Sequence, residues 1–206
     1  LRTGEPLRGK TLGIVGVGHV GSIVARYAEV MGMRVLRNDP PRAEREGGEG
    51  FVSLAQIAAE SDVVTLHVPL TKEGAHPTYH LANAAFFGQL AKRPWLINSC
   101  RGAVHDTAAL LAAKREGLIS QLIIDCWEQE PTISRALLSE ASLATPHIAG
   151  FSADGKANGT RACLQAIERF FGIHFALLDR VVPPAPSKPL IALDQWSTHR
   201  MEQALL

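Results

Sequence analysis

The sequence predicts an α/β protein: a doubly wound parallel β-sheet with helices on both of its faces. Two observations predict this fold. Short apolar runs alternate with segments of helical periodicity between residues 11 and 172, which is typical of a parallel sheet with crossover helices. A glycine-rich stretch, GVGHVG at 16–21, follows the first apolar run and opens the first helix.

Each predicted strand is a short apolar run that stops at a glycine, a proline or a polar residue. The helices repeat their apolar residues every three or four positions, and some carry local start and stop signals. Ser53 and Gln56 form a capping box, Asp106 is an N-cap, and Gly32 and Gly117 end helices. The expected strands are 11–17, 33–39, 62–70, 95–100, 122–127 and 143–148, and the expected helices are 19–32, 53–60, 78–92, 106–117 and 154–172.

The composition excludes several classes of function. Of the 206 residues, 46% are hydrophobic and 20% are charged, and the net charge is +1, so nothing favours binding to nucleic acid or to an anionic membrane surface. No apolar run approaches the ~20 residues that span a bilayer. The three cysteines, Cys100, Cys126 and Cys163, are odd in number and far apart, which favours a reducing cytoplasm over a disulfide framework.

The glycine-rich turn has the context of a dinucleotide-binding site. Gly16 permits a tight turn, Gly18 lets the backbone approach a pyrophosphate, and Gly21 lets the helix pack closely on the strand. The helix N-terminus at His19 and Val20 presents free N–H groups and a partial positive charge to the phosphates. The alternative is a glycine turn that serves packing alone.

The second predicted strand ends in Asp39, 18 residues after Gly21. A carboxylate there can accept hydrogen bonds from both hydroxyls of the adenosine ribose, and it would repel a 2′-phosphate. The sequence therefore favours NAD over NADP as the cofactor. Arg37 and Arg42 lie nearby and weaken this inference, and a surface aspartate is the alternative interpretation.

Three residues near the ends of later strands form a candidate catalytic set: Arg101, Glu130 and His147. An arginine can clamp a carboxylate and polarise a carbonyl oxygen. Histidine titrates near neutrality and can take a hydroxyl proton, while a glutamate fixes its tautomer and stabilises the imidazolium. Asp125 ends its strand where it could face the nicotinamide carboxamide. Taken singly, each residue also has a non-catalytic interpretation. Arg101 could be a surface loop arginine, Glu130 a turn carboxylate and His147 a core histidine.

The remaining histidines and cysteines are interpreted as structural or surface residues. We expect His67 and His80 to be structural and His76 and His105 to be exposed. No pair has the spacing and the carboxylate or cysteine support of a metal site, so no metal is expected. Cys100 is interpreted as a small buried filler, and Cys126 and Cys163 as core residues.

Four stretches together resemble the NAD-dependent D-isomer-specific 2-hydroxyacid dehydrogenases over residues 9–172: GKTLGIVGVGHVGSIVAR, INSCRGAVHDTAALL, DCWEQEP and TPHIAG. The resemblance implies that NAD collects the hydride while His147 exchanges the proton, supported by Glu130 and by Arg101, which also contacts the substrate. It further implies that Val68 and the residues Ser99, Cys100 and Arg101 line the cofactor. Asp125 and Gly150 are expected at its nicotinamide half.

Three further stretches, NDPPRAEREG, PLTKEGAHPTYHL and HIAGFSADGKANGT, resemble one branch of this family whose substrate is a phosphorylated 2-hydroxy acid. That branch usually carries a substrate-contacting tyrosine where this chain has Phe151, so the ring is kept and the hydroxyl is lost. The resemblance also implies a homodimer, and a substrate domain and a dimerisation domain that are largely missing from this chain. The expected parts are a linker (1–8), an NAD-binding Rossmann domain (9–150), a helix returning to the substrate domain (151–172), and a proline-rich linker that begins a truncated C-terminal region (173–206).

Other functions stay open at this point. The chain is also compatible with another D-2-hydroxyacid dehydrogenase, acting on glycerate, phosphoglycerate or hydroxypyruvate. A non-catalytic NAD-sensing protein is a candidate from a different class. We expect the 206 residues alone to bind NAD but to turn over poorly, because water would not be excluded from the site.

Overall fold

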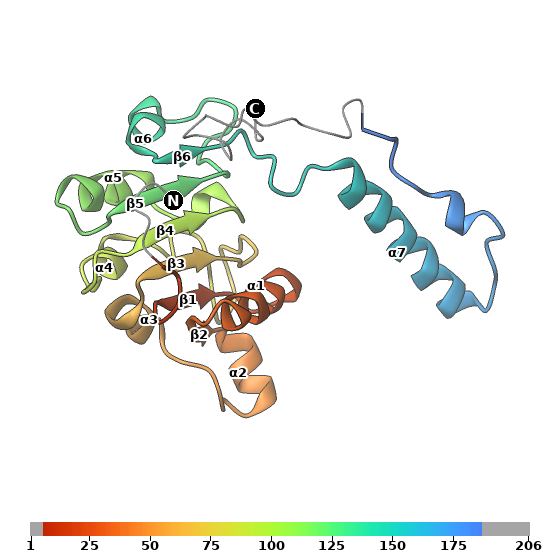
Figure 1. Cartoon of the computed structure of the whole chain (residues 1–206), viewed down its shortest axis with the longest axis horizontal. Helices are drawn as coiled ribbons and strands as arrows, with labels where there is room; N and C mark the ends of the chain where they lie inside the picture. The colour runs from red at the N-terminus through yellow and green to blue at the C-terminus, as the bar shows by residue number, and fades with distance from the viewer. Residues whose placement is uncertain (1–5, 187–206) are drawn as a thin grey trace. The chain divides into compact units, whose positions relative to one another are not determined.

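The computed structural model describes residues 6–186 and has two units, Leu1–Ala149 and Gly150–Leu206 (Figure 1). The first unit contains a parallel six-stranded sheet, as the sequence predicts, and the structure shows the strand order β2-β1-β3-β4-β5-β6. Its strands are β1 (Thr11–Val15), β2 (Arg34–Asn38), β3 (Val63–Leu66), β4 (Trp95–Asn98), β5 (Gln121–Ile124) and β6 (Leu143–Ala144).

The strand order reverses direction at β1. The chain crosses from β1 to β2 on one side, and β3 then pairs with the other side of β1. In open α/β sheets, ligands bind in the crevice outside the carboxyl ends of the strands at such a switch point. The fold therefore places the expected binding crevice beyond Val15 and Leu66.

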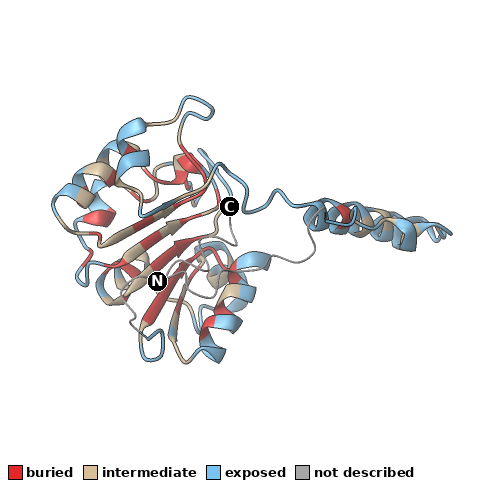
Figure 2. Ribbon diagram, turned by 45° about the horizontal axis from the view of Figure 1, so that its top comes forward, coloured by how far each residue is buried: buried red, intermediate tan, exposed pale blue. Residues whose placement is uncertain are grey.

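Helices flank the sheet on both faces, and the alternation of side chains along β1 shows which helix covers which face (Figure 1). Leu12 and Ile14 pack in one buried cluster with Ala25 of α1, whereas Val15 packs in a larger one with Ile57 of α3. Figure 2 shows that buried residues concentrate on the strands and on the helix faces turned toward them. The helices of this unit are α1 (His19–Val30), α2 (Pro40–Glu46), α3 (Leu54–Glu60), α4 (Ala84–Phe87), α5 (Thr107–Arg115) and α6 (Arg135–Glu140).

The helix expected at 78–92 is much shorter in the structure. Only Ala84–Phe87 is helical, and it begins at Asn83, whose side chain accepts a hydrogen bond from the backbone of Phe86. Just before it, Ala82 forms an isolated parallel bridge with His105. The segment leading into α4 thus pairs with the loop after β4, and this tertiary pairing overrides the local helical periodicity.

Two other elements differ from the prediction. The sequence analysis missed α2, although Asp39 caps it and Pro40 occupies its first position, both good helix-start signals. The last strand is shorter than the predicted 143–148, because β6 contains only Leu143 and Ala144. The residues after it leave the sheet and bind Asp125 instead, as described below.

The second unit contains one long helix, α7 (Ala153–Phe171), close to the predicted 154–172. Ser152 caps its start, and Gly172 ends it in the left-handed conformation, with φ of +65°. A short 3₁₀ helix follows at Leu178–Arg180. The element expected at the start of the C-terminal region, from residue 190 onward, lies outside the described residues, and the assignment of residues to linker and domains stays a prediction.

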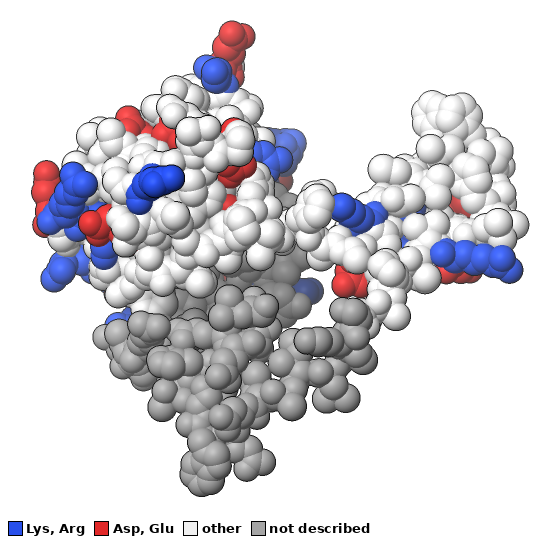
Figure 3. All heavy atoms as spheres, turned by 90° about the horizontal axis from the view of Figure 1, so that it is seen from above, with Lys and Arg blue, Asp and Glu red and all other residues white. Residues whose placement is uncertain are grey.

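Charged side chains are mixed on the surface: in the face shown in Figure 3, basic and acidic residues of the first unit are interspersed. Between residues 6 and 186, no helix has both the length and the apolar character to cross a membrane. Cys100 and Cys126 are buried, as expected. Cys163 is exposed, so its prediction as a core residue is wrong: it lies on an exposed face of α7.

Candidate active site

The glycine-rich turn joins β1 to α1, and two of its glycines are required by the fold itself. Gly16 has φ of +90°, and a Cβ there would lie 2.7 Å from the carbonyl carbon of His67. A Cβ on Gly21 would lie 2.1 Å from the Gly16 carbonyl oxygen. Gly18 differs, because a Cβ there would meet no atom within 4 Å. The described neighbours of Gly18 therefore leave room for a side chain at this position. A ligand that closely approached the backbone would instead require glycine there.

The N-terminus of α1 is left open to an anion. Gly18 is its N-cap, so no side chain accepts a hydrogen bond from the first N–H groups, and the first turn holds no acidic residue. His19 and Val20 begin the helix and are exposed. Unsatisfied N–H groups and the helix dipole make such an end favourable for a phosphate.

Asp39 follows β2 and links the turn to α2. Its carboxylate accepts hydrogen bonds from the backbone N–H of Val17 at 2.8 Å and of Arg42 at 3.1 Å. The side chain caps α2 and remains half-buried. A carboxylate can accept about four hydrogen bonds, so Asp39 retains the capacity to bind ribose hydroxyls.

A cleft of about 780 Å³ extends from this turn along the carboxyl ends of β1, β2 and β3. Gly16, Gly18, Asp39 and Val68 line it, so four of the predicted cofactor residues share one cavity. Most of its remaining wall is apolar, which suits a flat base. That wall includes Pro40, Pro41, Phe51, Pro69, Pro77 and Leu81.

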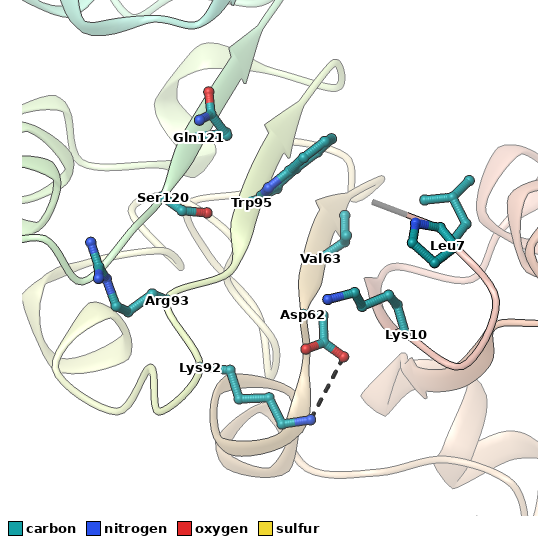
Figure 4. Close-up of a pocket in the computed structure, with 10 residues that line it drawn as sticks. Leu7, Lys10, Asp62, Val63, Lys92, Arg93, Trp95, Ser120 and Gln121 are labelled. Atoms are coloured by element: carbon teal, nitrogen blue, oxygen red, sulfur yellow. Dashed lines mark ion pairs between the residues drawn. The ribbon is translucent and has the colours of Figure 1, made fainter. Parts of the chain in front are cut away.

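A second cavity, of about 400 Å³, lies at the opposite edge of the sheet, around the residues that begin the strands (Figure 4). Lys92 and Asp62 form an ion pair there at 3.6 Å, beside Trp95 and Gln121. None of the predicted site residues lines this cavity. It also lies at the amino ends of the strands, away from the edge where ligands of such sheets bind.

Glu130 and His147 meet beyond the ends of β5 and β6. The Glu130 carboxylate and the His147 Nδ1 lie 2.7 Å apart, and Glu130 also accepts a hydrogen bond from the Trp127 N–H at 2.7 Å. Although partial burial acts to raise it, these hydrogen bonds hold the pKa of Glu130 below its usual value. An ionised carboxylate on Nδ1 makes this nitrogen the proton donor, which leaves Nε2 able to accept a proton.

Asp125 holds the loop that carries His147. Its carboxylate accepts hydrogen bonds from the Thr145 hydroxyl at 2.5 Å and from the N–H groups of Ile148 and Ala149 at 2.8 and 3.0 Å. Burial acts to raise the pKa of Asp125, but these three donors bring it below its ordinary value. The loop clamped in this way contains His147 in a left-handed conformation, with φ of +55°. The expected contact of Asp125 with the nicotinamide stays a prediction.

Arg101 lies on the loop after β4, next to the loop that carries Glu130. A Cβ on Gly102 would lie 2.0 Å from the backbone of Trp127, so the two loops are in direct contact. The exposed Arg101 guanidinium donates to the Cys100 carbonyl at 2.6 Å and makes no hydrogen bond to Glu130 or His147 within the described residues. The structure therefore joins Glu130 to His147, and the role of Arg101 stays a prediction.

The other predicted cofactor residues fall in two places. Ser99 and Cys100 belong to the Arg101 loop, where burial raises the pKa of the Cys100 thiol. Gly150 and Phe151 belong to the second unit, where Lys156 lies over the Phe151 ring at 3.6 Å. Their contacts with cofactor and substrate stay predictions.

His105 corrects the sequence analysis most clearly. It was expected to be exposed, but it is fully buried, and its Nδ1 accepts a hydrogen bond from the Asn98 amide at 2.8 Å. Burial lowers the pKa of His105 to about 4. His76 is half-buried rather than exposed and pairs with Glu44 at 2.8 Å. Within residues 6–186, no three potential metal ligands cluster.

Sequence reasoning missed the residues that assemble the site from separate loops. Trp127 donates its indole N–H to the Thr145 carbonyl at 2.9 Å, and so ties the Glu130 loop to the His147 loop. His80 binds Glu128 at 2.7 Å, which connects the segment beside the cleft to the same region. These partners lie 18 and 48 residues apart, so no local pattern signals them.

Comparison with known proteins shows which family and which enzymes this chain is similar to. Residues 2–149 match the family model described as the D-isomer specific 2-hydroxyacid dehydrogenase, NAD binding domain. The erythronate-4-phosphate dehydrogenase of Porphyromonas gingivalis is 53% identical over 100% of this chain and 56% of its own length. The enzyme of the same name from Bacteroides thetaiotaomicron is 55% identical over 88% of this chain and 51% of its own length. The chain thus spans about half the length of these curated relatives.

Solved structures show the same fold. The apo D-mandelate dehydrogenase of Rhodotorula graminis superposes with a TM-score of 0.70 at 32% identity, over 82% of this chain and 50% of its own. The D-lactate dehydrogenase of Aquifex aeolicus, solved with NAD and lactic acid, gives 0.65 at 31% identity, over 82% and 55%. This chain therefore belongs to the D-isomer specific 2-hydroxyacid dehydrogenase family, and its residues 2–149 match the NAD binding domain of that family.

Proposed function

We propose that this chain is the cofactor-binding part of an enzyme that oxidises 4-phospho-D-erythronate to 2-oxo-3-hydroxy-4-phosphobutanoate, a step toward pyridoxal 5′-phosphate. The two relatives named erythronate-4-phosphate dehydrogenase, at 53% and 55% identity, support this substrate. The observation that carries the chemistry is the 2.7 Å contact between Glu130 and His147 beside an NAD binding domain.

The residues of the cleft fit the cofactor. The open space at Gly18 and the uncapped start of α1 receive the pyrophosphate, and Asp39 binds the adenosine ribose hydroxyls. Val68 and the apolar wall would hold the adenine end, and the Ser99–Arg101 loop and Asp125 would hold the nicotinamide end. When bound, NAD supplies the acceptor for the hydride.

The proton is handled by the pair at the ends of β5 and β6. The Nε2 atom of His147 takes the proton of the substrate hydroxyl, while Glu130 on Nδ1 keeps the tautomer and stabilises the imidazolium. Asp125 positions the loop that carries this histidine. Arg101 binds the substrate carboxylate and polarises the oxygen at the reacting carbon. Phe151 offers the substrate a ring face without a hydroxyl.

Turnover of the full-length protein on a panel of 2-hydroxy acids tests this proposal, with NADH formation as the readout. 4-Phospho-D-erythronate should be preferred, and a clear preference for phosphoglycerate or glycerate would overturn the substrate assignment. NAD binding without NADH formation on any acid would instead indicate a sensor. We expect the full-length protein to be a cytoplasmic homodimer, which its sedimentation checks, and residues 1–206 alone to bind NAD but turn over poorly.

A further inference from the structure

An arginine lies across the glycine-rich turn with both edges of its guanidinium occupied. Arg42, on α2, donates through Nη1 to the Val17 carbonyl at 2.5 Å and to the Ser22 hydroxyl at 3.4 Å. Its Nε and Nη2 bind the two carboxylate oxygens of Glu46, at 2.9 and 2.7 Å. The guanidinium carbon also lies 5.4 Å from the centre of the Phe51 ring. All three nitrogens of the guanidinium therefore have hydrogen-bond partners.

Arg42 adjoins Asp39, which lines the cleft, although Arg42 itself is not among the lining residues. Arg42 and Asp39 share Val17 as a partner: the guanidinium binds its carbonyl, and the carboxylate binds its N–H. The backbone N–H of Arg42 donates to Asp39 as well. If Asp39 receives the ribose hydroxyls, the Arg42 guanidinium lies beside the place where a 2′-phosphate would sit.

An arginine at this place is the usual device for accepting a 2′-phosphate, because its planar fork matches phosphate oxygens in a bidentate pair. In this chain the Glu46 carboxylate already binds Nε and Nη2 of Arg42, the pair of donors that would bind a phosphate. Hydrogen bonds from Arg42 and Arg45 lower the pKa of Glu46 to about 2, so it stays ionised throughout the physiological range. Arg37, the other arginine near Asp39, is paired with Glu29.

We propose that Glu46 is a specificity-determining residue of the cofactor cleft: by occupying the fork of Arg42, it keeps this arginine from binding a 2′-phosphate. NADP is then rejected twice, by the charge of Asp39 and by the engagement of Arg42 with Glu46. This inference rests on the proposed function of the cleft as the NAD site.

The test is a set of dissociation constants for NAD and NADP, measured by calorimetry on the 206-residue chain. In an Asp39→Ser background, adding Glu46→Ala should strengthen NADP binding on the order of tenfold, since it frees a charge-assisted bidentate site, and should leave NAD binding nearly unchanged. Glu46→Ala alone should have a smaller effect, because Asp39 still repels the phosphate. Adding Arg42→Met to the double variant should abolish the gain.

A matched control separates the specific effect from general charge. Glu49→Gln removes one carboxylate near the end of the same helix without touching Arg42, and it should not improve NADP binding. If Glu49→Gln improves it as much, or if Glu46→Ala does not improve it in the Asp39→Ser background, the inference is wrong. Should Glu46→Ala lose its circular dichroism signal, Glu46→Gln keeps the side-chain length and gives the same comparison. Failure of the unmodified chain to bind NAD would overturn the proposed function itself, a distinct result.

Discussion

Asp39 and Asp125 each directly follow a strand of the same sheet, and both hold neighbouring backbone through N–H groups, yet they leave different chemistry open. Asp39 accepts two such bonds, is half-buried and lines the cleft. Asp125 is only 5% exposed, and the loop around His147 donates three hydrogen bonds to it. Burial and the number of internal donors therefore separate a carboxylate that can still bind a ligand from one committed to positioning.

The two regions also differ in how they are assembled. The ribose end is built largely within one β-turn-helix-β segment, from Gly16 to Arg42. The end proposed for proton transfer joins the loops after β4, β5 and β6, and its contacts depend on Trp127 and Asp125. We expect substitutions at the first region to change cofactor choice, and substitutions at the second to change the rate.

The largest effect is expected from His147→Gln in the full-length protein. Loss of the base should reduce turnover by about 10²–10⁴-fold while the dissociation constant for NAD stays nearly the same. Stopped-flow turnover and NAD titration measure the two quantities. His174→Gln, an exposed histidine outside the site, is the control. Near-normal turnover of His147→Gln would remove this residue from the proton-transfer role.

Burial distinguishes His105 from His147, as it distinguishes the two aspartates. Because His105 is buried, we expect it to make the stability of the protein depend on pH. Its folded pKa of about 4 lies below its ordinary value of 6.5, so the unfolded chain binds this proton more readily. The stabilisation is complete above pH 6.5 and is lost progressively as the pH falls toward 4, by at most about 3 kcal/mol. Urea unfolding across this range should show the free energy of unfolding decreasing as the pH falls, and His105→Gln should reduce the slope of this dependence. An unchanged slope in that variant would contradict the assignment.

The next effect is expected from Asp125→Asn. The amide keeps one acceptor oxygen but loses the charge, so the loop of His147 is held less firmly. The free energy of unfolding should fall by about 1–3 kcal/mol, and turnover of the full-length protein should fall about tenfold. Thr145→Val removes only one of the three bonds and should give a fraction of both losses. Equal losses in the two variants would argue against a shared clamp.

The smallest effect is expected from Asp39→Ala, which should weaken NAD binding about tenfold or less and relax the rejection of NADP. The variant also loses the N-cap of α2, at a cost of about 1 kcal/mol in stability. Titration with both dinucleotides measures the change in preference. If the preference for NAD survives intact, Asp39 is not the ribose ligand.

The sequence alone was sufficient for the main strands and for the glycine-rich turn, where local order carries the signal, although the local start signals of α2 were missed. The alternation of apolar runs and helical segments predicted the parallel sheet, and GVGHVG between a strand and a helix predicted the dinucleotide turn. The family was predicted from motifs at strand ends and is confirmed by the match over residues 2–149. Predictions failed at 78–83 and His105, where distant segments meet, and at Cys163, which lies on an exposed face of α7.

What the sequence determined is which chemical groups stand at the ends of the strands, because strand, turn and cap signals act over a few neighbouring residues. Only the tertiary structure decided which of these groups are buried, which are paired and which remain available. Asp125, Arg42 and His105 bind Ala149, Val17 and Asn98, which lie 24, 25 and 7 positions away along the chain. Burial and hydrogen-bond partners set both the charge and the orientation of a side chain, so they decide its function.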